Sequence, residues 1–466
     1  FLTRVTKQRK WKKEEKKKKN KKEIVKKLEF QCESDEKQQE CIDILNQRIF
    51  KSKTINHQHL LVIVNPFSGQ KKGVETFQSF CKPIFDLAPH ITYHYIVSKN
   101  PEHPVELGRK INLEQYDGAV IVGGDGTISL FVQGLRKNKN PLAIKLPIGH
   151  IPCGSGNGLA SSLGAFTPSE GALVITRGFT EKLDVISMFQ DGKHNMVFLM
   201  SAWAVIADVD IGSEEFRQWG SLRFAIGALY YIMKKASYNA TLKIITSSSF
   251  TSHSLNDKSK KYTSTLDSAY NYKDCYTEDD AKLSYPYINR FFKKELDVIA
   301  ESTNDNEEDV TMTTPHIQES SIEVEQERSY QFPEDVKIET ITMKFFLFLM
   351  SNTAMLASDF FGSPNQECAS GTFDVLYAKS MSRTKLLGAL NKMENGSILK
   401  EPAITKISTK AFYFEPEKEE SFLSVDGESL PIHPFLMEVH PQYMNVYSWN
   451  KRGPKLPSVI PLESDL

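Results

Sequence analysis

Asp125 is the side chain best placed to do chemistry, because it stands alone in a run of glycines. The stretch at 116–135 reads YDGAVIVGGDGTISLFVQGL, in which the apolar strand at 118–122 stops at the glycines and Thr127 starts a helix. Glycines let a phosphate approach the backbone, and a helix N-terminus offers N–H donors. A carboxylate there repels phosphate unless it handles a proton or a metal intervenes. The turn therefore suggests a catalytic phosphate site.

Two more strands run into turns of small and polar residues. The stretch at 60–69 reads LLVIVNPFSG, and the one at 147–160 reads PIGHIPCGSGNGLA, where Ser155 can donate to a phosphate oxygen. One glycine turn is common to any doubly wound fold. Three in a row place three turns along the carboxyl edge of one parallel sheet, where such folds bind ligands.

A pair of carboxylates forms a second candidate site. Asp208 and Asp210 are two residues apart in IADVDIGSEEFRQWGSLRF, so on a strand both side chains would share one face. Arg217 and Arg223 follow on a loop that enters a helix. By itself this pattern fits a structural salt-bridge cluster, but arginine also suits phosphate binding and an aspartate suits a cationic amine with hydroxyls.

In combination these motifs resemble a known family. NPFSG, GGDGT and IPCGSGN, in this order, look like the nucleotide-binding motifs of the diacylglycerol-kinase-type lipid kinases. SAWAVIADVDIGSEEFRQWGSLRF at 201–224 and the triplet Asp426, Gly427 and Glu428 resemble the sphingosine kinases specifically. The resemblance runs from about residue 28 to 450, with one long interruption.

The resemblance assigns roles to individual residues. Asp125 would be the general base that takes the proton of a primary hydroxyl, and Glu214 would support the ATP side. Lipid contacts would come from Gly123, Asp125, Asp208 and Asp210. The implied ATP contacts are Asn65, Pro66, Phe67, Ser98, Lys99, Asn100, Pro101, Glu102, Gly124, Gly126, Thr127, Gly154, Ser155, Gly156, Arg217, Arg223, Asp426, Gly427 and Glu428.

The sequence departs from the family at three positions. Leu130 replaces the usual glutamate after GGDG, Gln133 replaces an asparagine, and Trp203–Ala204 stands where Trp-Gly is usual. Loss of the glutamate removes an expected nucleotide or magnesium contact, so activity could be reduced. The chain has no GxxxxGK[ST] motif, so Mg²⁺ is expected to bridge the phosphate oxygens, with its protein ligands unknown.

The order of patterns predicts an α/β nucleotide domain with a doubly wound parallel sheet, followed by a β-rich antiparallel lipid domain. Strands at 60–64, 91–97 and 118–122 alternate with helices near 73–86, 104–113 and 169–177; later helices are expected near 218–236 and 382–394. The predicted boundaries are a basic tail at 1–27, a remnant of a pleckstrin-homology-like segment at 28–56, the nucleotide domain at 57–178, the lipid domain at 179–246 and 336–450, a disordered insert at 247–335 and a tail at 451–466.

The balance of charged residues limits the classes of partner that the sequence predicts. The 466 residues carry 58 Lys and Arg against 58 Asp and Glu, so no general affinity for nucleic acid is expected. The basic tail is expected to be solvated, with contact to an anionic membrane surface as the alternative.

Six scattered cysteines suit a reducing cytosol. No apolar run reaches membrane-spanning length, so peripheral membrane contact is expected. A homodimer remains open, and a sequence starting at Phe1 is expected to continue upstream.

The leading prediction is an ATP- and Mg²⁺-dependent kinase for the primary hydroxyl of a sphingoid long-chain base. A ceramide or diacylglycerol kinase is the nearest alternative, and a catalytically weakened lipid-binding scaffold is the other, because of Leu130 and Gln133. The lipid is expected to enter past the apolar segment at 345–361, FFLFLMSNTAMLASDFF, although such a run could equally fill a core.

Overall fold

The computed structural model describes residues 57–212, 230, 237–251, 276–301, 330–379 and 382–449. All of them lie within one compact unit, Thr54–Leu466. The calls made for Glu214, Arg217 and Arg223, for the tails and for the helix near 218–236 fall outside the described residues, apart from residue 230, and stay predictions.

The first part of the described chain is a parallel sheet in the order β2-β1-β3-β4. Its strands are β1 (Gln58–Val64), β2 (Ile91–Val97), β3 (Gly118–Gly123) and β4 (Ile148–Pro152). The helical segments between and after them are α2 (Ser68–Lys71), α3 (Gly73–Thr76), the π-helical turn η1 (Phe77–Cys81), α4 (Lys82–Asp86), α5 (His103–Lys110), α6 (Asp125–Arg136), the 3₁₀ turn η2 (Pro141–Lys145), α7 (Gly158–Ser162) and α8 (Pro168–Thr176).

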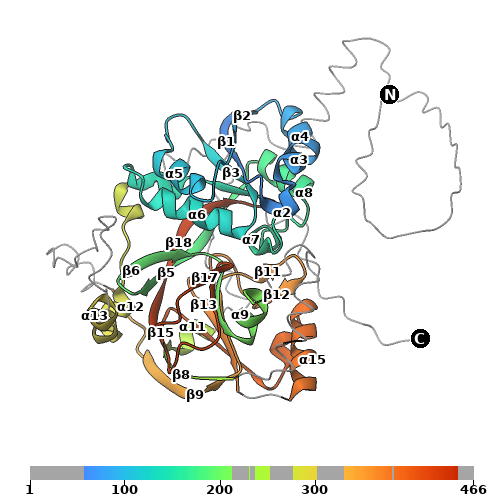
Figure 1. The fold of residues 1–466 in the computed structure, drawn as a ribbon. Coiled ribbons are helices and arrows are strands. Elements are labelled where there is room, and N and C mark those ends of the chain that lie inside the picture. The colour runs from blue at the N-terminus through green and yellow to red at the C-terminus, as the bar shows by residue number, and fades with distance from the viewer. Residues whose placement is uncertain are drawn as a thin grey trace, which may run out of the picture. The chain divides into compact units, whose positions relative to one another are not determined.

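Helices cover both faces of these strands, which explains why the strand sequences are apolar throughout. Every residue of β3 is buried, and so are all residues of β1 after His59. Helix α5 packs on α6, while α4 and η1 pack on α8, and Figure 1 shows the two groups on either side of the strands. The predicted doubly wound α/β arrangement is confirmed.

One long strand joins this sheet to the second half of the chain. Strand β18 (Phe435–Tyr447) pairs in parallel with β4 through Val446 and Ile148, and antiparallel with β5 (Thr180–Gln190) and β15 (Ala411–Pro416). The resulting sheet of ten strands continues through β8 (Tyr238–Thr246) to β9 (Lys337–Phe345), and β6 (Lys193–Val197) pairs with β5. Strands from the α/β half and from the β-rich half therefore belong to one continuous sheet.

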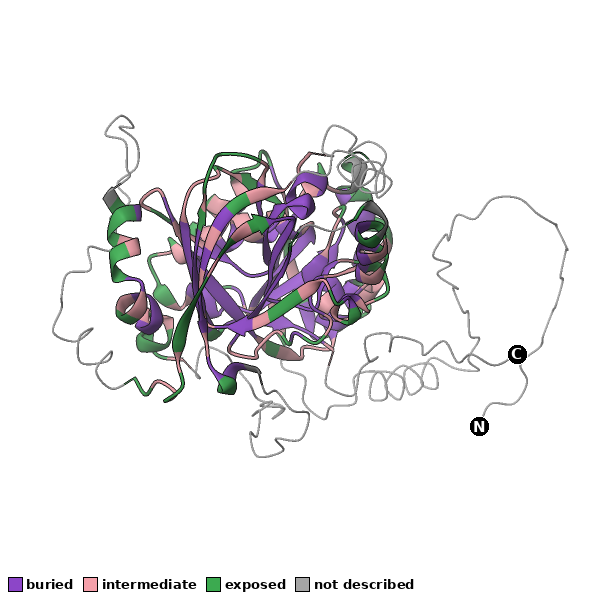
Figure 2. Cartoon of the chain, turned by 90° about the horizontal axis from the view of Figure 1, so that it is seen from below, coloured by how far each residue is buried: buried purple, intermediate pink, exposed green. Residues whose placement is uncertain are grey.

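A second, antiparallel sheet of six strands packs on the first. Its order is β14-β13-β10-β7-β16-β17. The bounds are β7 (Met200–Ala204), β10 (Leu347–Ser351), β13 (Phe373–Ala378), β14 (Ile404–Thr409), β16 (Leu423–Val425) and β17 (Glu428–Leu430). Aromatic side chains from both sheets, among them Trp203, Phe348 and Phe414, fill the space between them. Figure 2 shows this buried centre within more exposed helices and loops. The predicted antiparallel β-rich half is confirmed.

The remaining elements are short. They are α9 (Val205–Asp210), α11 (Ser248–Thr251), the 3₁₀ turn η5 (Glu278–Ala281), α12 (Pro286–Phe291), α13 (Lys293–Glu301), the hairpin of β11 (Met355–Ala357) and β12 (Phe360–Phe361), α15 (Arg383–Glu394) and the 3₁₀ turn η6 (Ile398–Lys400).

The first half of the expected lipid entrance is core. Phe345 to Met350 are at most 1% exposed. Phe345 pairs with Tyr238 in the first sheet and Leu347 pairs with Ala378 in the second, so the chain changes sheets at Phe346 and both of its faces are covered. Within the segment at 345–361, the β11–β12 hairpin differs, because Phe360 and Phe361 are partly exposed, and the entrance stays a prediction there.

Part of the expected disordered insert is folded. Residues 276–301 form η5, α12 and α13, and Tyr287, Ile288 and Phe292 are at most 2% exposed. The carboxylate of Glu438 on β18 accepts hydrogen bonds from the backbone N–H groups of Tyr287, at 3.0 Å, and Ile288, at 2.8 Å. Tyr287 of α12 also contacts the rings of Phe250 and Phe332, which belong to the same insert, so these aromatic side chains form one apolar cluster. The ranges 252–275 and 302–329 lie outside the described residues.

Candidate active site

Asp125 is the first residue of α6 and is held by the next glycine turn. Its Oδ2 accepts a hydrogen bond from the N–H of Gly158 at 2.9 Å, and its Oδ1 accepts one from the N–H of Leu159 at 3.1 Å. The residue is 8% exposed. Two backbone donors thus orient a carboxylate that still reaches the surface, as a general base for a bound hydroxyl requires.

The two glycine turns lie back to back. A Cβ atom on Gly154 would come within 2.5 Å of the Gly124 Cα atom. Asn157 adopts a left-handed conformation with φ of 63°. Its side chain closes the turn, because Oδ1 accepts from the Gly154 N–H at 2.7 Å and Nδ2 donates to the Gly154 carbonyl at 2.9 Å. Ser155 is exposed beside them. Only glycine permits such a close approach of the two turns.

The NPFSG turn joins this pair through its asparagine. Asn65 Nδ2 donates to the hydroxyl of Thr127 at 2.9 Å, and Asn65 Oδ1 accepts from the Phe67 N–H at 3.0 Å. Phe67 itself is 60% exposed, and Pro66 is partly exposed. The three turns predicted from sequence are therefore in contact at the carboxyl ends of β1, β3 and β4.

The Ser98–Glu102 stretch follows β2 at the same edge of the sheet. Ser98 N–H donates to the Val64 carbonyl at 2.8 Å, and its hydroxyl is buried without a hydrogen-bond partner among the described residues. Lys99, Asn100, Pro101 and Glu102 are exposed, and the Lys99 N–H donates to His103 at 3.1 Å. Buried hydroxyl groups without a partner are rare in folded proteins, so the Ser98 hydroxyl is an unusual feature of this edge.

The Asp426–Glu428 triplet is the turn between β16 and β17. Asp426 and Gly427 have φ of 50° and 84°, the conformation of a tight hairpin turn. A Cβ atom on Gly126 would lie 2.5 Å from Glu428 Oε1, so the glutamate lies over the first turn of α6. Glu428 is exposed, and the hairpin brings its carboxylate to the glycine turns at 123–127 and 153–157, here called the phosphate turns.

Asp426 itself faces the protein interior. Its carboxylate accepts hydrogen bonds from the N–H groups of Phe198 at 3.1 Å, Leu199 at 2.9 Å and Met200 at 2.9 Å. Burial raises the pKa of Asp426 to about 7, the nearby Asp125 adds to this, and the three backbone donors oppose it. This geometry gives Asp426 a role in holding the hairpin, whereas Glu428 is exposed.

The carboxylate pair lies on a helix, and the prediction that it lies on a strand is wrong. Asp208 and Asp210 belong to α9. Asp208 is 1% exposed and accepts from the hydroxyls of Tyr238 at 2.9 Å and Ser421 at 2.6 Å. Asp210 is more exposed and accepts from the Ser424 hydroxyl at 2.7 Å. Asp208 is thus tied into the structure, while Asp210 is the more accessible of the two.

A backbone feature explains why this segment is helical. Ala204, the residue before α9, has φ of 60° and ψ of −141°. This conformation is unfavourable for any residue with a Cβ atom and accounts for the glycine usual at that position. The turn ends β7 and redirects the chain into α9, which the local residue pattern does not reveal.

Gln133 has a structural role. Its Nε2 donates to the Met196 carbonyl at 2.9 Å and its Oε1 accepts from the Met196 N–H at 3.4 Å, so it pins α6 to β6. Leu130 is partly exposed on the same helix. The substitution of asparagine by Gln133 therefore preserves a polar side chain with backbone partners.

The β11–β12 hairpin covers the third turn, which the sequence did not indicate. Asn157 bridges to Ala357, the Ser358 N–H donates to the Gly156 carbonyl at 3.1 Å, and the Met355 N–H donates to the Ser162 hydroxyl at 3.0 Å. Partly buried Phe360 packs on the apolar cluster that includes residues of α9 and α15. The hairpin therefore links the phosphate turns to an apolar region.

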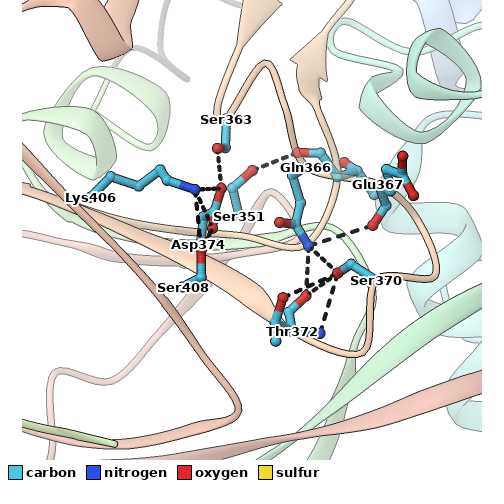
Figure 3. Close-up of polar contacts among 10 residues, drawn as sticks. Ser351, Ser363, Gln366, Glu367, Ser370, Thr372, Asp374, Lys406 and Ser408 are labelled. Atoms are coloured by element: carbon cyan, nitrogen blue, oxygen red, sulfur yellow. Dashed lines mark hydrogen bonds and ion pairs between the residues drawn. The ribbon is translucent and has the colours of Figure 1, made fainter. Parts of the chain in front are cut away.

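A polar network anchors the loop that follows the hairpin. Asp374 accepts hydrogen bonds from Ser363, from Ser408 at 2.6 Å and from Lys406 at 3.0 Å (Figure 3). Gln366 donates to the Thr372 carbonyl at 2.6 Å. Since Asp374 is 1% exposed and fully partnered, this network is structural.

The described residues contain neither a metal-holding cluster of side chains nor a helix that could span a membrane. Within 57–449, excluding the gaps given above, no three His, Cys, Asp or Glu side chains are grouped so as to hold a metal ion. In the same residues, no helix combines the length and the apolar character needed to cross a membrane.

Comparisons with known proteins agree with this geometry. The model of the diacylglycerol kinase catalytic domain matches residues 59–188, and that of the YegS C-terminal NAD kinase beta sandwich-like domain matches residues 318–448. Sphingosine kinase 1 of Arabidopsis thaliana is 28% identical over 407 residues, which cover 80% of this chain and 70% of the relative. Sphingoid long chain base kinase 4 of Schizosaccharomyces pombe is 25% identical over 391 residues, covering 83% and 74%.

A solved structure also shares the fold. A protein of Bacillus anthracis str. Sterne, assigned as a diacylglycerol kinase, aligns with a TM-score of 0.53 at 16% identity, covering 85% of this chain and 97% of that one. At this identity the similarity shows the fold alone.

The two domain matches and the relatives show that the chain is a lipid kinase, and residues 59–188 are similar to the catalytic domain of the diacylglycerol kinase type. Within that superfamily its similarity is to the sphingosine kinases, which confirms the resemblance predicted from the motifs.

Proposed function

We propose that this enzyme transfers the γ-phosphoryl group of ATP to the primary hydroxyl of a sphingoid long-chain base. The observation that carries the proposal is the position of Asp125, whose carboxylate is oriented by Gly158 and Leu159 at the junction of the glycine turns. In the proposed step the Asp125 carboxylate takes the hydroxyl proton as that oxygen bonds to the γ-phosphorus. The bond from the γ-phosphorus to the bridging oxygen breaks, and ADP leaves.

The substrate class is supported by the carboxylates on α9. A sphingoid base carries a cationic amine near its primary hydroxyl, whereas ceramide and diacylglycerol have no charged amine. Asp210 is accessible and is oriented by Ser424, two residues before Asp426. Glu428 in the same hairpin lies over Gly126 in the first turn of α6, so the β16–β17 hairpin connects the α9 carboxylates to the helix that begins with Asp125. The names of the relatives, sphingosine and sphingoid long chain base kinases, support the same class.

The nucleotide is proposed to lie across the turns that contain Asn65, Gly124 and Gly154, with Glu428 facing it. Mg²⁺ is proposed as the counter-ion. Because Mg²⁺ in kinases is usually held by one or two carboxylates together with substrate phosphates and water, the phosphate oxygens would supply several of its ligands. When bound, the ion would offset the negative charge of the phosphates.

The long chain of the base is proposed to pass the β11–β12 hairpin. Phe360 is partly buried against an apolar cluster that also includes Val209 of α9 and Leu390 of α15. Peripheral contact with a membrane would deliver such a substrate, and it remains part of the proposal.

The test is phosphoryl transfer from radiolabelled ATP to sphingosine, ceramide and diacylglycerol, each presented in the same detergent micelles. We expect product with sphingosine and at least about tenfold less with the other two lipids, since loss of one charge-assisted contact costs about 1.5–3 kcal/mol. Preference for ceramide or diacylglycerol would overturn the substrate class. Absence of transfer to any lipid would favour the scaffold alternative.

A further inference from the structure

His150 is a buried histidine of β4 that contacts the backbone on both sides of Asp125. It is 4% exposed. Its Nε2 lies 3.1 Å from the carbonyl oxygen of Gly123, at the end of β3, and its Nδ1 lies 3.1 Å from the backbone nitrogen of Ala160, in α7. The same Nδ1 is 3.9 Å from Asp125 Oδ1.

The two hydrogen bonds fix the form of the ring. Nδ1 faces an N–H group and must accept, so it carries no proton. Nε2 faces a carbonyl and must donate, so it carries the proton. Only the neutral imidazole satisfies both partners. Burial lowers the pKa of His150 and outweighs the opposing effect of the Asp125 carboxylate, which agrees with a neutral ring.

The partners of His150 are the two backbone segments that determine where the Asp125 carboxylate points. Gly123 is two residues before Asp125 and fixes the point at which α6 begins. Ala160 directly follows Gly158 and Leu159, whose N–H groups hold the carboxylate. A ring between these segments sets the distance from the end of β3 to α7.

We propose that His150 is a positioning residue for phosphoryl transfer, acting as a neutral brace between the Gly123 carbonyl and the Ala160 amide and so fixing Asp125 against α7. This inference rests on the proposed function, because it assumes that Asp125 is the base. His150 touches neither ATP nor lipid in this account. Its loss therefore lowers kcat and leaves both KM values nearly unchanged.

Three substitutions separate the two hydrogen bonds. His150→Asn keeps an acceptor near the position of Nδ1, His150→Gln keeps a donor near the position of Nε2, and His150→Ala keeps neither. A displacement of about 1 Å in a catalytic group can lower the rate by about a hundredfold. We expect kcat to fall about a hundredfold for His150→Ala and by a smaller factor for the other two. KM for ATP and for the lipid should stay within about threefold.

His90 provides a matched control for the loss of a buried histidine. It is 7% exposed, its Nε2 lies 2.7 Å from the Thr176 carbonyl, and it belongs to the same α/β half of the protein. His90→Ala should lower the melting temperature about as much as His150→Ala, with kcat per folded molecule unchanged. Equal kcat losses in the two variants would show that His150 has only a structural role.

The experiment is steady-state kinetics of the full chain and its variants with ATP and sphingosine, with the folded fraction measured by circular dichroism. A kcat loss with constant KM in His150→Ala, partly restored in His150→Asn or His150→Gln, supports the inference. Wild-type kcat in any folded His150→Ala preparation overturns it, and so does a loss that appears only as a raised KM. If wild type acts on diacylglycerol instead, the proposed substrate fails and the same comparison is made with that lipid. Absence of transfer by wild type to every lipid overturns both proposals.

Discussion

Removal of the Asp426 carboxylate separates the two roles that this residue could have. The family resemblance makes Asp426 an ATP contact, whereas its carboxylate accepts from three buried N–H groups, those of Phe198, Leu199 and Met200. An unsatisfied buried donor costs about 1–3 kcal/mol. Asp426→Ala leaves all three without an acceptor, which amounts to roughly 3–9 kcal/mol of lost stability and approaches the whole stability of a typical domain.

Asp426→Asn is the milder change and tests the same geometry. Its remaining oxygen can replace Oδ1, which accepts from Leu199 and Met200, so only the Phe198 N–H loses its acceptor. The expected loss is about 1–3 kcal/mol.

Thermal unfolding and the KM for ATP together decide between the roles. We expect a lower melting temperature for Asp426→Asn, a larger drop or failure to fold for Asp426→Ala, and little change in KM for ATP in whatever folds. Glu428→Gln is the control, since Glu428 is exposed in the same turn and should change KM for ATP without changing the melting temperature. The reasoning is refuted if Asp426→Ala melts like wild type while its KM for ATP rises tenfold or more.

Further variants test the roles of Gly154, Asp210 and Asp184. Gly154→Ala should weaken ATP binding at least about tenfold, measured by calorimetry, because the added Cβ atom would lie 2.5 Å from the Gly124 Cα atom. Gly388→Ala is the control, because its Cβ atom would meet nothing within 4 Å, and it should bind ATP as tightly as the wild type. Asp210→Asn should raise KM for sphingosine about tenfold or more and leave KM for ATP unchanged, whereas equal rises in both would indicate a structural role. Burial raises the pKa of Asp184 from 3.8 to about 7, so the folded state holds a proton that the unfolded state releases. The stability that comes from this proton is present below about pH 4 and is lost as pH rises through about 7. The melting temperature of the wild type should therefore fall more steeply between these pH values than that of Asp184→Asn, and parallel curves would contradict the assignment.

The phosphate turns were predictable because their signals are local. An apolar strand that ends in GGDG or in PCGSGN specifies its own strand, turn and helix start, and the carboxyl edge of a parallel sheet then brings the turns together. The contact between Gly124 and Gly154 follows from that arrangement, because the two turns end neighbouring parallel strands.

Elements that depend on distant partners were missed or misassigned. The IADVD segment alternates like a strand, yet the backbone turn at Ala204 and hydrogen bonds from Tyr238 and Ser421 make it the helix α9. The role of His150 is not visible in the sequence, because its hydrogen-bond partners are backbone atoms of Gly123 and Ala160, 27 and 10 residues away.

Apolar runs were ambiguous for a related reason. Phe345 to Met350 fits either a core or a lipid channel by composition, and only the change of sheets at Phe346 shows that both faces are covered. In the insert, by contrast, Tyr287, Phe291 and Phe292 were a usable signal for a folded segment within a polar region.

The central claim is that Asp125 is the general base, and Asp125→Asn tests it most directly. Asparagine keeps the size of the side chain and an acceptor for the Leu159 N–H but cannot take a proton. Single-turnover phosphorylation of sphingosine, with melting temperature and ATP affinity measured on the same preparation, should show a rate lower by about a hundredfold to ten-thousandfold, with the fold and nucleotide binding preserved. A rate equal to that of wild type would contradict the account.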